Sequence, residues 1–545
     1  MNGKTIFLKP NLVIEPLIAR WYAWSHLISP GTASLNIVKR HLEIMNSYVE
    51  SPELHVAAVK DPKMLGGPFM DYDSNRTKDI SNLIEYTLDK QNDLVGMAFA
   101  LRKLNKMLKT TAKGYSLEQL YAEVPDVLKG YVELVYDLNN NPSFRIYEYL
   151  LYNSKYYKPE LQSFALWLTD NDTRPFCLST PRLGAANVLD LHLPFESPLI
   201  DELSKMKKTP RPYDEIRQLL GISDRDEPLF QTFFTEKSPA FYEKYNGDKI
   251  RMRYFGHACI LIETKDISIL VDPLISYYGY QSDVEHFSDY DLPDFIDYVL
   301  ITHNHQDHIL LETLLPLRQR IGNLIVPRSG GGSLQDPSLK LMFTHIGFRN
   351  VIELDEMELL KRHDCTIQGI HFTGEHSDLN IKTKACYNVR IGDFSLLFMA
   401  DSRVIDPALY EHIRRLTGPV DVIFLGMECD GAPLTWLYGP LMFDEISKEN
   451  DQSRRLSGSD CRKGMSLVDI FNPSEVYVYA MGQEPWCTFI SSIKYTDESN
   501  PIIQSNNLIG ECLKQGIIAE RLFGEKEILY SKKNVRQDGR LMPAE

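Results

Sequence analysis

The chain has 545 residues, 43% of them hydrophobic and 24% charged, and its formal net charge is −15. This length exceeds what one hydrophobic core organises, so we expect at least two domains. The acidic charge argues against non-specific binding to nucleic acid or to an anionic membrane surface. We find no apolar run of the roughly 18 residues that a membrane span needs.

The cysteines and the N-terminal segment indicate a reducing compartment. The eight cysteines are scattered and form no CxxC pair, which is typical of free thiols rather than of a disulfide framework. Residues 1–17 lack an unbroken apolar run and a small-residue cleavage site, so we predict no secretory signal. We therefore expect a cytoplasmic globular protein.

The first part of the chain is rich in helical periodicity. Residues 51–64, 80–111 and 116–128 carry apolar side chains at three- and four-residue steps, which predicts amphipathic helices. The aromatic segment 144–154 fits either a strand or a helix. A polar stretch with Pro239 and Gly247 follows, and we place a domain boundary there. The expected division is an N-terminal α+β domain, residues 1–245, and a catalytic domain, residues 246–545.

After this boundary the pattern changes to short β-rich runs separated by turns. A buried strand is predicted at 298–302 and a helix at 309–322, which Gly322 is expected to end. A further helix is predicted at 407–416. Other predicted strands are 250–255, 258–263, 268–273, 323–327, 385–392, 395–401, 420–427 and 475–482. Strands interleaved with helices predict a layered α/β domain.

The segment "THNHQDH" concentrates metal-binding side chains on one loop. Three imidazoles and one carboxylate, from His303, His305, Asp307 and His308, lie within six residues between a predicted strand and a predicted helix. Neutral imidazole is the commonest nitrogen ligand of metals, and a carboxylate compensates charge. The H-x-H step lets two rings bind one ion, and the D-H step can serve a second ion beside it. A metal site is therefore predicted here.

This H-x-H-x-D-H loop after a strand resembles the metallo-β-lactamase superfamily. Residues 256–273 are similar to its opening strands, which end in an aspartate under the metal loop. The superfamily pattern continues with a histidine, a bridging aspartate and a last histidine. Asp401, at the end of an apolar strand, fits the bridging aspartate. His412 is the last histidine of the chain, and we expect it on a helix surface.

The chain departs from the superfamily at two of these positions. The third-ligand position offers Glu375 directly before His376, and no histidine is left for the last position. The usual zinc hydrolase set therefore cannot be completed. If Glu375 is the ligand, the site has three histidines and three carboxylates, which favours redox-active ions such as non-haem iron. The missing histidine would leave an open position for dioxygen.

A more specific resemblance covers residues from about 15 to about 490. The chain resembles the metallo-β-lactamase-fold diiron monooxygenases, the family of the amino-acid β-hydroxylase of chloramphenicol biosynthesis. In that family the glutamate is the ligand and the last histidine is absent, as here. The resemblance implies a C-terminal αββα sandwich with a separate N-terminal domain. The segments that carry it include "EPLIARWYAW", "YFGHACILIE", "LITHNHQDHILLETLL", "GEHSDLNIKTK", "FMADSR" and "EVYVYAMGQEPW".

The resemblance also implies roles for individual residues. One iron would be bound by His303, His305 and Glu375, the second by Asp307 and His308, with Asp401 bridging the two. His376 would at most orient Glu375 by a hydrogen bond. Apart from the resemblance, Glu428, which follows the predicted strand 420–427, is expected to be a supporting or proton-handling carboxylate. Residues 435–440 fit the lining of the pocket and ordinary core packing equally well.

The implied reaction is the β-hydroxylation of an amino acid held as a thioester on a carrier domain of a non-ribosomal peptide synthetase. It uses dioxygen and two electrons. We find no flavin or nicotinamide fingerprint, and the glycine-rich segment 329–336 fits a flexible loop better than a cofactor site. An external electron donor is therefore expected.

Carrier domains are usually acidic, so docking calls for basic residues on this acidic chain. The basic segments 205–212 and 454–464 are the candidates. The N-terminal domain is expected to form a homodimer contact, a cap over the metal site, or both.

Two other readings remain open at this point. A metal-dependent hydrolase, such as a lactonase or phosphodiesterase with zinc or manganese, keeps the fold and the loop. It would need His376 as a ligand and one further ligand that we do not identify. A non-catalytic binding or scaffold protein is the third reading, and the nearly complete ligand set argues against it.

Overall fold

The computed structural model describes residues 4–171, 173–240, 242–278, 283–531, 536–537 and 540–541. Short 3-10 segments interrupt its loops throughout. They are η2 (Pro62–Met64), η3 (Glu118–Glu123), η4 (Asp126–Leu128), η5 (Pro159–Leu161), η6 (Asp289–Asp291), η7 (Arg318–Arg320), η8 (Gly439–Leu441) and η9 (Pro485–Cys487). In the described part of the chain, no helix combines the length and hydropathy that a membrane crossing requires.

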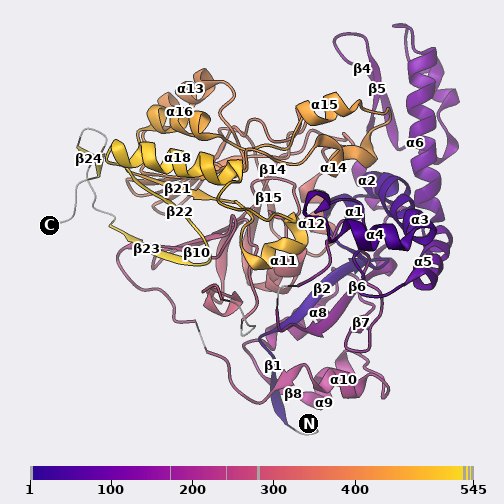
Figure 1. Ribbon diagram of the computed structural model, residues 1–545, viewed down its shortest axis with the longest axis horizontal. Coiled ribbons are helices and arrows are strands. Elements are labelled where there is room, and N and C mark those ends of the chain that lie inside the picture. The colour runs from indigo at the N-terminus through magenta and orange to yellow at the C-terminus, as the bar shows by residue number, and fades with distance from the viewer. Residues whose placement is uncertain are drawn as a thin grey trace.

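The N-terminal part combines a group of helices with small antiparallel sheets (Figure 1). The sheets have the strand orders β3-β2-β6-β7 and β8-β1-β9, with a separate hairpin β4-β5. The strands are β1 (Thr5–Leu8), β2 (Leu12–Ile18), β3 (Trp21–Tyr22), β4 (Val132–Tyr136), β5 (Pro142–Ile146), β6 (Gln162–Leu168), β7 (Leu189–Leu191), β8 (Arg211–Pro212) and β9 (Phe234–Thr235). The helices are α1 (Ser25–Ile28), α2 (Pro30–Asn36), the π-helix η1 (Ile37–His41), α3 (Leu42–Glu50), α4 (Pro52–Ala58), α5 (Thr77–Lys90), α6 (Asn92–Thr111), α7 (Glu148–Tyr152), α8 (Pro198–Lys205), α9 (Tyr213–Leu219) and α10 (Glu227–Gln231).

The C-terminal part is built on two sheets that each contain seven described strands. The first has the order β15 (Val351–Leu354), β14 (Ile321–Pro327), β13 (Ile296–Leu300), β12 (Ser268–Val271), β11 (Ile260–Glu263), β10 (Ile250–Tyr254) and β23 (Lys526–Tyr530). The second has the order β16 (Leu359–Arg362), β17 (Cys365–Ile370), β18 (Cys386–Ile391), β19 (Phe394–Phe398), β20 (Val422–Gly426), β21 (Glu475–Tyr479) and β22 (Ile518–Arg521). A small pair, β24 (Arg536–Gln537) and β25 (Arg540–Leu541), lies near the C-terminus.

Helices cover the outer faces of both sheets, so the domain has four layers. One apolar core lies between the sheets, and the outer face of the second sheet packs against three helices on its solvent side (Figure 1). This architecture confirms the predicted αββα sandwich. The helices are α11 (Leu311–Leu317), α12 (Leu339–His345), α13 (Pro407–Thr417), α14 (Leu434–Tyr438), α15 (Lys448–Ser453), α16 (Cys461–Phe471), α17 (Thr488–Ser491) and α18 (Asn500–Lys514).

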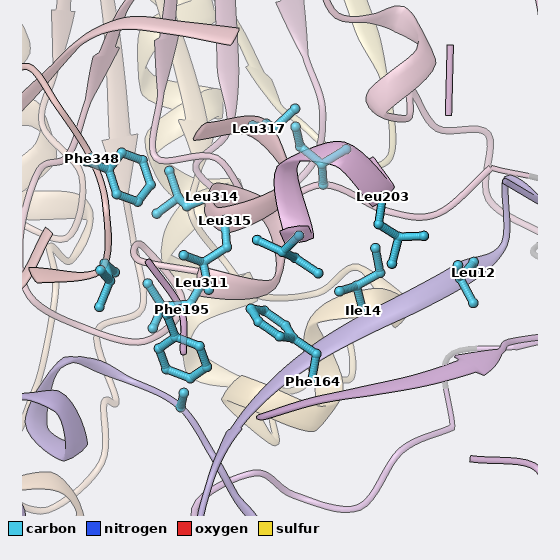
Figure 2. Close-up of a cluster of buried hydrophobic side chains, with 14 of the residues drawn as sticks. Leu12, Ile14, Phe164, Phe195, Leu203, Leu311, Leu314, Leu315, Leu317 and Phe348 are labelled. Carbon is cyan, nitrogen blue, oxygen red and sulfur yellow. The ribbon is translucent and has the colours of Figure 1, made fainter. Parts of the chain in front are cut away.

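The outer face of the first sheet is covered partly by the N-terminal part of the chain. Figure 2 shows Ile14 of β2 and Phe164 of β6 facing the same cluster as Leu311 and Leu314 of α11. These side chains are buried, so the two parts of the chain share one hydrophobic core. Helix α11 begins at Leu311, shortly after the candidate metal loop 303–308. The packing of α11 in this core therefore holds the C-terminal end of that loop in place.

A buried ion pair crosses the same interface. Arg174 Nη1 lies 2.9 Å from Glu312 Oε2, and the guanidinium stacks on the Phe489 ring at 3.4 Å from its centroid. The hydroxyl of Tyr22 and that of Tyr277 also donate to the Glu312 carboxylate, at 3.2 and 2.6 Å. The network ties the helix after the metal loop to the N-terminal part.

Removing the cation from this network is expected to destabilise the fold. Arg174→Met should lower the free energy of unfolding by about 3–5 kcal/mol, because it leaves the buried Glu312 charge unpaired. Urea denaturation would measure the change. The matched control is Arg145→Met, which removes an exposed pair with Glu133 and should change stability by at most about 1 kcal/mol. Equal effects of the two substitutions would contradict this account.

Several sequence expectations need correction. Gly322 does not end a helix, because Pro316 lies inside α11, the chain tightens into η7, and β14 has already begun at Ile321. The predicted helix at 80–111 is divided at Gln91 into α5 and α6. Residues 116–128 form 3-10 turns rather than an α-helix. The ambiguous segment 144–154 is both strand and helix, β5 followed by α7.

The domain division at residue 245 remains our proposal. The last N-terminal strand is β9, and the first strand of the sandwich is β10, which begins at Ile250. Strand β23 returns from near the C-terminus to pair with β10. The expected boundary thus lies in the stretch between β9 and β10.

Candidate metal centre

The predicted metal residues converge at one end of the sandwich. The loop 303–308 follows β13, and the loops that carry Glu375, Asp401 and Glu428 follow β17, β19 and β20. Strands β12 and β13 run parallel, as do β19 and β20, so each pair brings the loops that follow it to the same edge. Strand register thus places Asp272 beside the loop 303–308 and Glu428 beside Asp401, and the packing of one sheet on the other brings these two edges together.

The first cluster joins the H-x-H step to Glu375. His305 Nδ1 lies 3.1 Å from His303 Nε2 and 3.0 Å from Glu375 Oε1. Two ligand atoms about 2.1 Å from one ion and at right angles around it are about 3 Å apart. His305 Nδ1 therefore has ligand spacing to both neighbours, and His303, His305, Glu375 and His376 each offer one ligand atom within 4.8 Å of the others.

The second cluster centres on His308. Its Nε2 atom lies 3.1 Å from Asp401 Oδ2 and 4.0 Å from Asp307 Oδ2. Asp401 Oδ2 is also 3.6 Å from His303 Nε2, which belongs to the first cluster. Asp401 therefore lies between the two groups, where a bridging carboxylate would be needed. The four side chains are buried or nearly so.

Each of the three loop histidines has one ring nitrogen held by the protein and the other turned to the cluster. The side chain of His303 donates from Nδ1 to Thr302 Oγ1 at 3.0 Å, and that of His308 donates from Nδ1 to Asp272 Oδ2 at 2.8 Å. His305 Nε2 lies 2.9 Å from the Tyr438 hydroxyl. Such contacts fix the tautomer of a metal-binding histidine. Asp272 is the strand-end aspartate that the sequence predicted beneath the loop.

His257 is a residue that our sequence reasoning missed. Its Nδ1 atom accepts a hydrogen bond from the Gly482 amide at 3.2 Å, and its Nε2 atom lies 3.3 Å from Asp307 Oδ2. Because Nδ1 is an acceptor, the neutral ring carries its proton on Nε2. His257 therefore directs a proton toward Asp307 and does not offer a lone pair there. Its only sequence signal was its place in the segment 256–273.

Glu375 and His376 both lie at the centre. The Nδ1 atom of His376 is 2.8 Å from Glu375 Oε2, and its ring stacks on His305 with the centroids 4.7 Å apart. Burial lowers the pKa of His376 to about 4, although Glu375 opposes this, so the ring is neutral at pH 7. Neither His376 Nδ1 nor Glu375 Oε2 forms a hydrogen bond among the described residues, so the expected orienting role of His376 stays a prediction. The geometry leaves the choice of ligand between Glu375 and His376 to experiment.

The cluster has the properties of a site built for cations. Asp401 Oδ1 and His376 Nε2 are buried and have no hydrogen-bond partner among the described residues, a rare condition in proteins. Burial alone would raise the pKa of Asp307, but His308 and His257 together hold it below its usual value. Three imidazoles and three carboxylates in a buried pocket fit a dinuclear site of a redox-active metal.

Backbone strain accumulates around this centre. Glu375 adopts φ +60°, and Ser377 and Asp378 are also left-handed, as is Ala400 before Asp401. Gly374 has φ +77°, and a Cβ atom there would lie 2.3 Å from the Arg403 side chain. Left-handed non-glycine residues cost about 1–3 kcal/mol each and concentrate at functional sites. The conformation that directs Glu375 inward is therefore maintained at a cost in stability.

Glu428 lies beside the cluster, as expected. Burial raises the pKa of its carboxyl well above the usual value, and Asp401, Asp307 and Glu375 raise it further. The protonated form of Glu428 is thereby favoured. Of the residues 435–440, Thr435, Trp436, Gly439 and Pro440 line a cavity of about 900 Å³ that includes none of the predicted ligands, so the expected place of this segment at the metal-site pocket stays a prediction.

Cations of both basic segments are engaged in contacts within the chain. In 205–212, Lys207 pairs with Asp289 and Lys208 with Asp294. In 454–464, Arg454 and Arg455 donate from Nε to the carbonyls of Ser377 and Gly431. These arginines brace loops beside the metal centre, so their role in carrier docking stays a prediction.

The fold and the site define a metallo-β-lactamase-fold protein with a dinuclear metal centre. Residues 7–238 match the family described as the diiron non-heme beta-hydroxylase N-terminal domain, and residues 251–434 match the beta-lactamase superfamily domain. The 4-amino-L-phenylalanyl-[CmlP-peptidyl-carrier-protein] 3-hydroxylase of Streptomyces venezuelae is 37% identical in an alignment of 524 positions, which covers 94% of this chain and 98% of that enzyme. The chain therefore belongs to the diiron non-heme β-hydroxylases.

Structural similarity agrees with this assignment. The crystal structure of CmlA, a diiron β-hydroxylase from Streptomyces venezuelae, matches with a TM-score of 0.91 and 35% identity over 96% of this chain and 99% of that chain. A metal-dependent hydrolase of Shouchella clausii is 24% identical over 187 residues, only 32% of this chain. The predicted family, fold, enzyme class and diiron cofactor are thus confirmed. Family membership favours the oxygenase over the hydrolase and scaffold readings.

Proposed function

We propose that this enzyme hydroxylates the β-carbon of an amino acid tethered as a thioester to a carrier domain of a non-ribosomal peptide synthetase. The main support for this proposal is the nearly full-length similarity to a 3-hydroxylase whose name specifies an aminoacyl group on a peptidyl carrier protein. The reaction consumes dioxygen and two external electrons. We place it in natural-product biosynthesis and in the cytoplasm, which suits the eight free cysteines.

The proposed ligand sets follow the two clusters. His303, His305 and Glu375 would hold one iron, Asp307 and His308 the other, and Asp401 would lie between them. When bound, the iron pair supplies the activation of dioxygen. The protein fixes the ring orientations through Thr302, Asp272 and Tyr438 and excludes bulk water from the histidine side.

Substrate access is proposed on the carboxylate side of the centre. The Asp307 side chain is 21% exposed and that of Asp401 is 13% exposed, whereas His303 and His308 are fully buried. The substrate β-carbon would therefore approach past these two carboxylates. Glu428 couples electrostatically to both. Held in its protonated form, it is a proton donor for this side of the site.

Three partners complete the proposal: a carrier domain, an electron donor and a second copy of the chain. The homodimer is supported by large apolar side chains that are exposed on the N-terminal part of the chain. These side chains include Phe99 on α6, Tyr115, Leu138 in the β4-β5 turn, and Tyr149 on α7. A measurement of the protein's mass in solution would test the homodimer. Helix α6 and the hairpin β4-β5 project from the rest of the molecule (Figure 1), which leaves them free to meet a partner.

The first test combines metal content with product mass. Protein produced with iron available and purified without chelator should hold about two irons per chain. With a reductant and dioxygen, an aminoacyl-loaded carrier should gain the mass of one oxygen atom, and the same amino acid free in solution should not. Stoichiometric zinc that iron cannot replace, together with reductant-independent ester hydrolysis, would overturn the proposal.

A further inference from the structure

Helix α14 joins the N-terminal part of the chain to the metal centre. Its last residue, Tyr438, is buried, and its hydroxyl lies 2.9 Å from His305 Nε2. The opposite nitrogen of His305, Nδ1, faces His303 and Glu375. The hydrogen bond to Tyr438 is therefore made by the nitrogen that points away from the cluster.

The N-terminal part holds this helix at its carboxyl end. Arg40 Nη2 donates to the carbonyl of Trp436 at 2.7 Å and to that of Leu437 at 3.0 Å. These carbonyls lie in the last turn of α14, directly before the 3-10 segment η8, and carbonyls at a helix end commonly need a partner outside the helix. Trp436 Nε1 in turn donates to the Gly66 carbonyl at 2.8 Å. Two N-terminal segments thus fix the position of one short helix.

Arg40 is itself placed by an irregular helix. It lies in η1, a π-helical turn between α2 and α3, and the next residue, His41, stacks on Trp21 with the rings 3.8 Å apart. π-helical turns are rare and often occur at functional sites. Burial lowers the pKa of Arg40 to about 10, so the guanidinium stays charged at pH 7. The buried charge of Arg40 is compensated by its hydrogen bonds to the carbonyls of Trp436 and Leu437.

We propose that Tyr438 is a positioning residue for the metal centre and that Arg40 holds the helix that carries it. Tyr438 accepts the Nε2 proton of His305, which fixes the tautomer whose Nδ1 lone pair faces Glu375. The inference rests on the proposed function only in taking His305 as a ligand. It assigns the N-terminal part of the chain a direct role in setting the geometry of one metal ion.

The test is site-selective metal loss in Tyr438→Phe, which removes one hydroxyl and keeps the ring. Cobalt(II) or iron(II) is titrated into the full-length protein against a competing chelator, and the absorption of the bound cobalt is recorded. We expect the ion at the His303, His305 and Glu375 cluster to bind about 10- to 100-fold more weakly, with the other ion unchanged. Tyr290→Phe is the control, because the buried Tyr290 hydroxyl has no hydrogen-bond partner among the described residues.

Arg40 provides the second variant. Arg40→Met should cause the same selective loss, and Arg40→Lys, which keeps a cation near the two carbonyls, should restore part of it. Thermal melting without metal shows whether each variant folds. Wild-type affinity at both sites in folded Tyr438→Phe would overturn the proposal, as would equal weakening of both ions. Neither readout requires turnover, so a failed hydroxylation assay would refute the proposed function and leave this inference standing.

Discussion

Replacing Glu375 with glutamine is expected to remove one iron and nearly all hydroxylation. Glu375 Oε1 has ligand spacing to His305 Nδ1, and a neutral amide is a poor substitute for a carboxylate ligand. We expect kcat/KM to fall by about a thousandfold or more and the iron content to fall from about two to about one per chain. Iron analysis and the carrier mass assay would measure both effects.

The matched variant is His376→Phe, which keeps a ring stacked beside His305 and removes both nitrogens. If His376 only orients Glu375, this variant should keep both ions and lose at most about 100-fold in activity. The opposite pattern, with the ion lost in His376→Phe and kept in Glu375→Gln, would show that histidine is the ligand. That result would revive the hydrolase reading of the site.

Substituting Asp401 with alanine is expected to disrupt both clusters together. Its Oδ2 atom is 3.1 Å from His308 Nε2 and 3.6 Å from His303 Nε2. Its removal therefore takes a negatively charged ligand away from both proposed ion sites. We expect a loss of activity of about a thousandfold or more, weaker binding of both ions, and loss of magnetic coupling between the irons. Mössbauer and paramagnetic resonance spectra would show the coupling directly.

A control for Asp401 lies in the same loop. Asp406 accepts a hydrogen bond from the Ala408 amide and caps α13. Asp406→Ala should cost about 1 kcal/mol of stability, typical for a lost cap, without changing iron content or coupling. Two coupled irons in Asp401→Ala would show that this carboxylate does not bridge them.

The sequence was sufficient where the ligands are local. His303, His305, Asp307 and His308 occupy one loop, so their spacing alone predicted a metal site. Asp401 ends an apolar strand and was proposed because the superfamily resemblance expects a bridging aspartate after such a strand. His257 and Tyr438 were not predicted as parts of the centre because their roles depend on how distant loops approach. The sequence pattern of 435–440 fitted core packing equally well, and only the fold shows the Tyr438 hydroxyl beside His305.

Secondary structure showed the same limit. Nine of the sandwich strands were predicted, since their apolar runs are bounded by turns. The strands β15, β16, β17, β22 and β23 were not predicted. The end of α11 was wrong because Gly322 is a glycine of a strand, where Phe295 and the Asp297 carbonyl approach closely. The sequence alone does not distinguish a glycine that allows close packing of a neighbouring residue from a glycine that ends a helix. Only tertiary contacts separate the two cases.

The shared core of β2, β6 and α11 makes each part of this chain depend on the other for burial. A sandwich without its N-terminal partner would expose Leu311 and Leu314 to water, together with the buried carboxylate of Glu312 beside the candidate metal loop. A chimaera that exchanges one half of the chain with a related enzyme must therefore also supply the matching apolar side chains and the cation that pairs with Glu312.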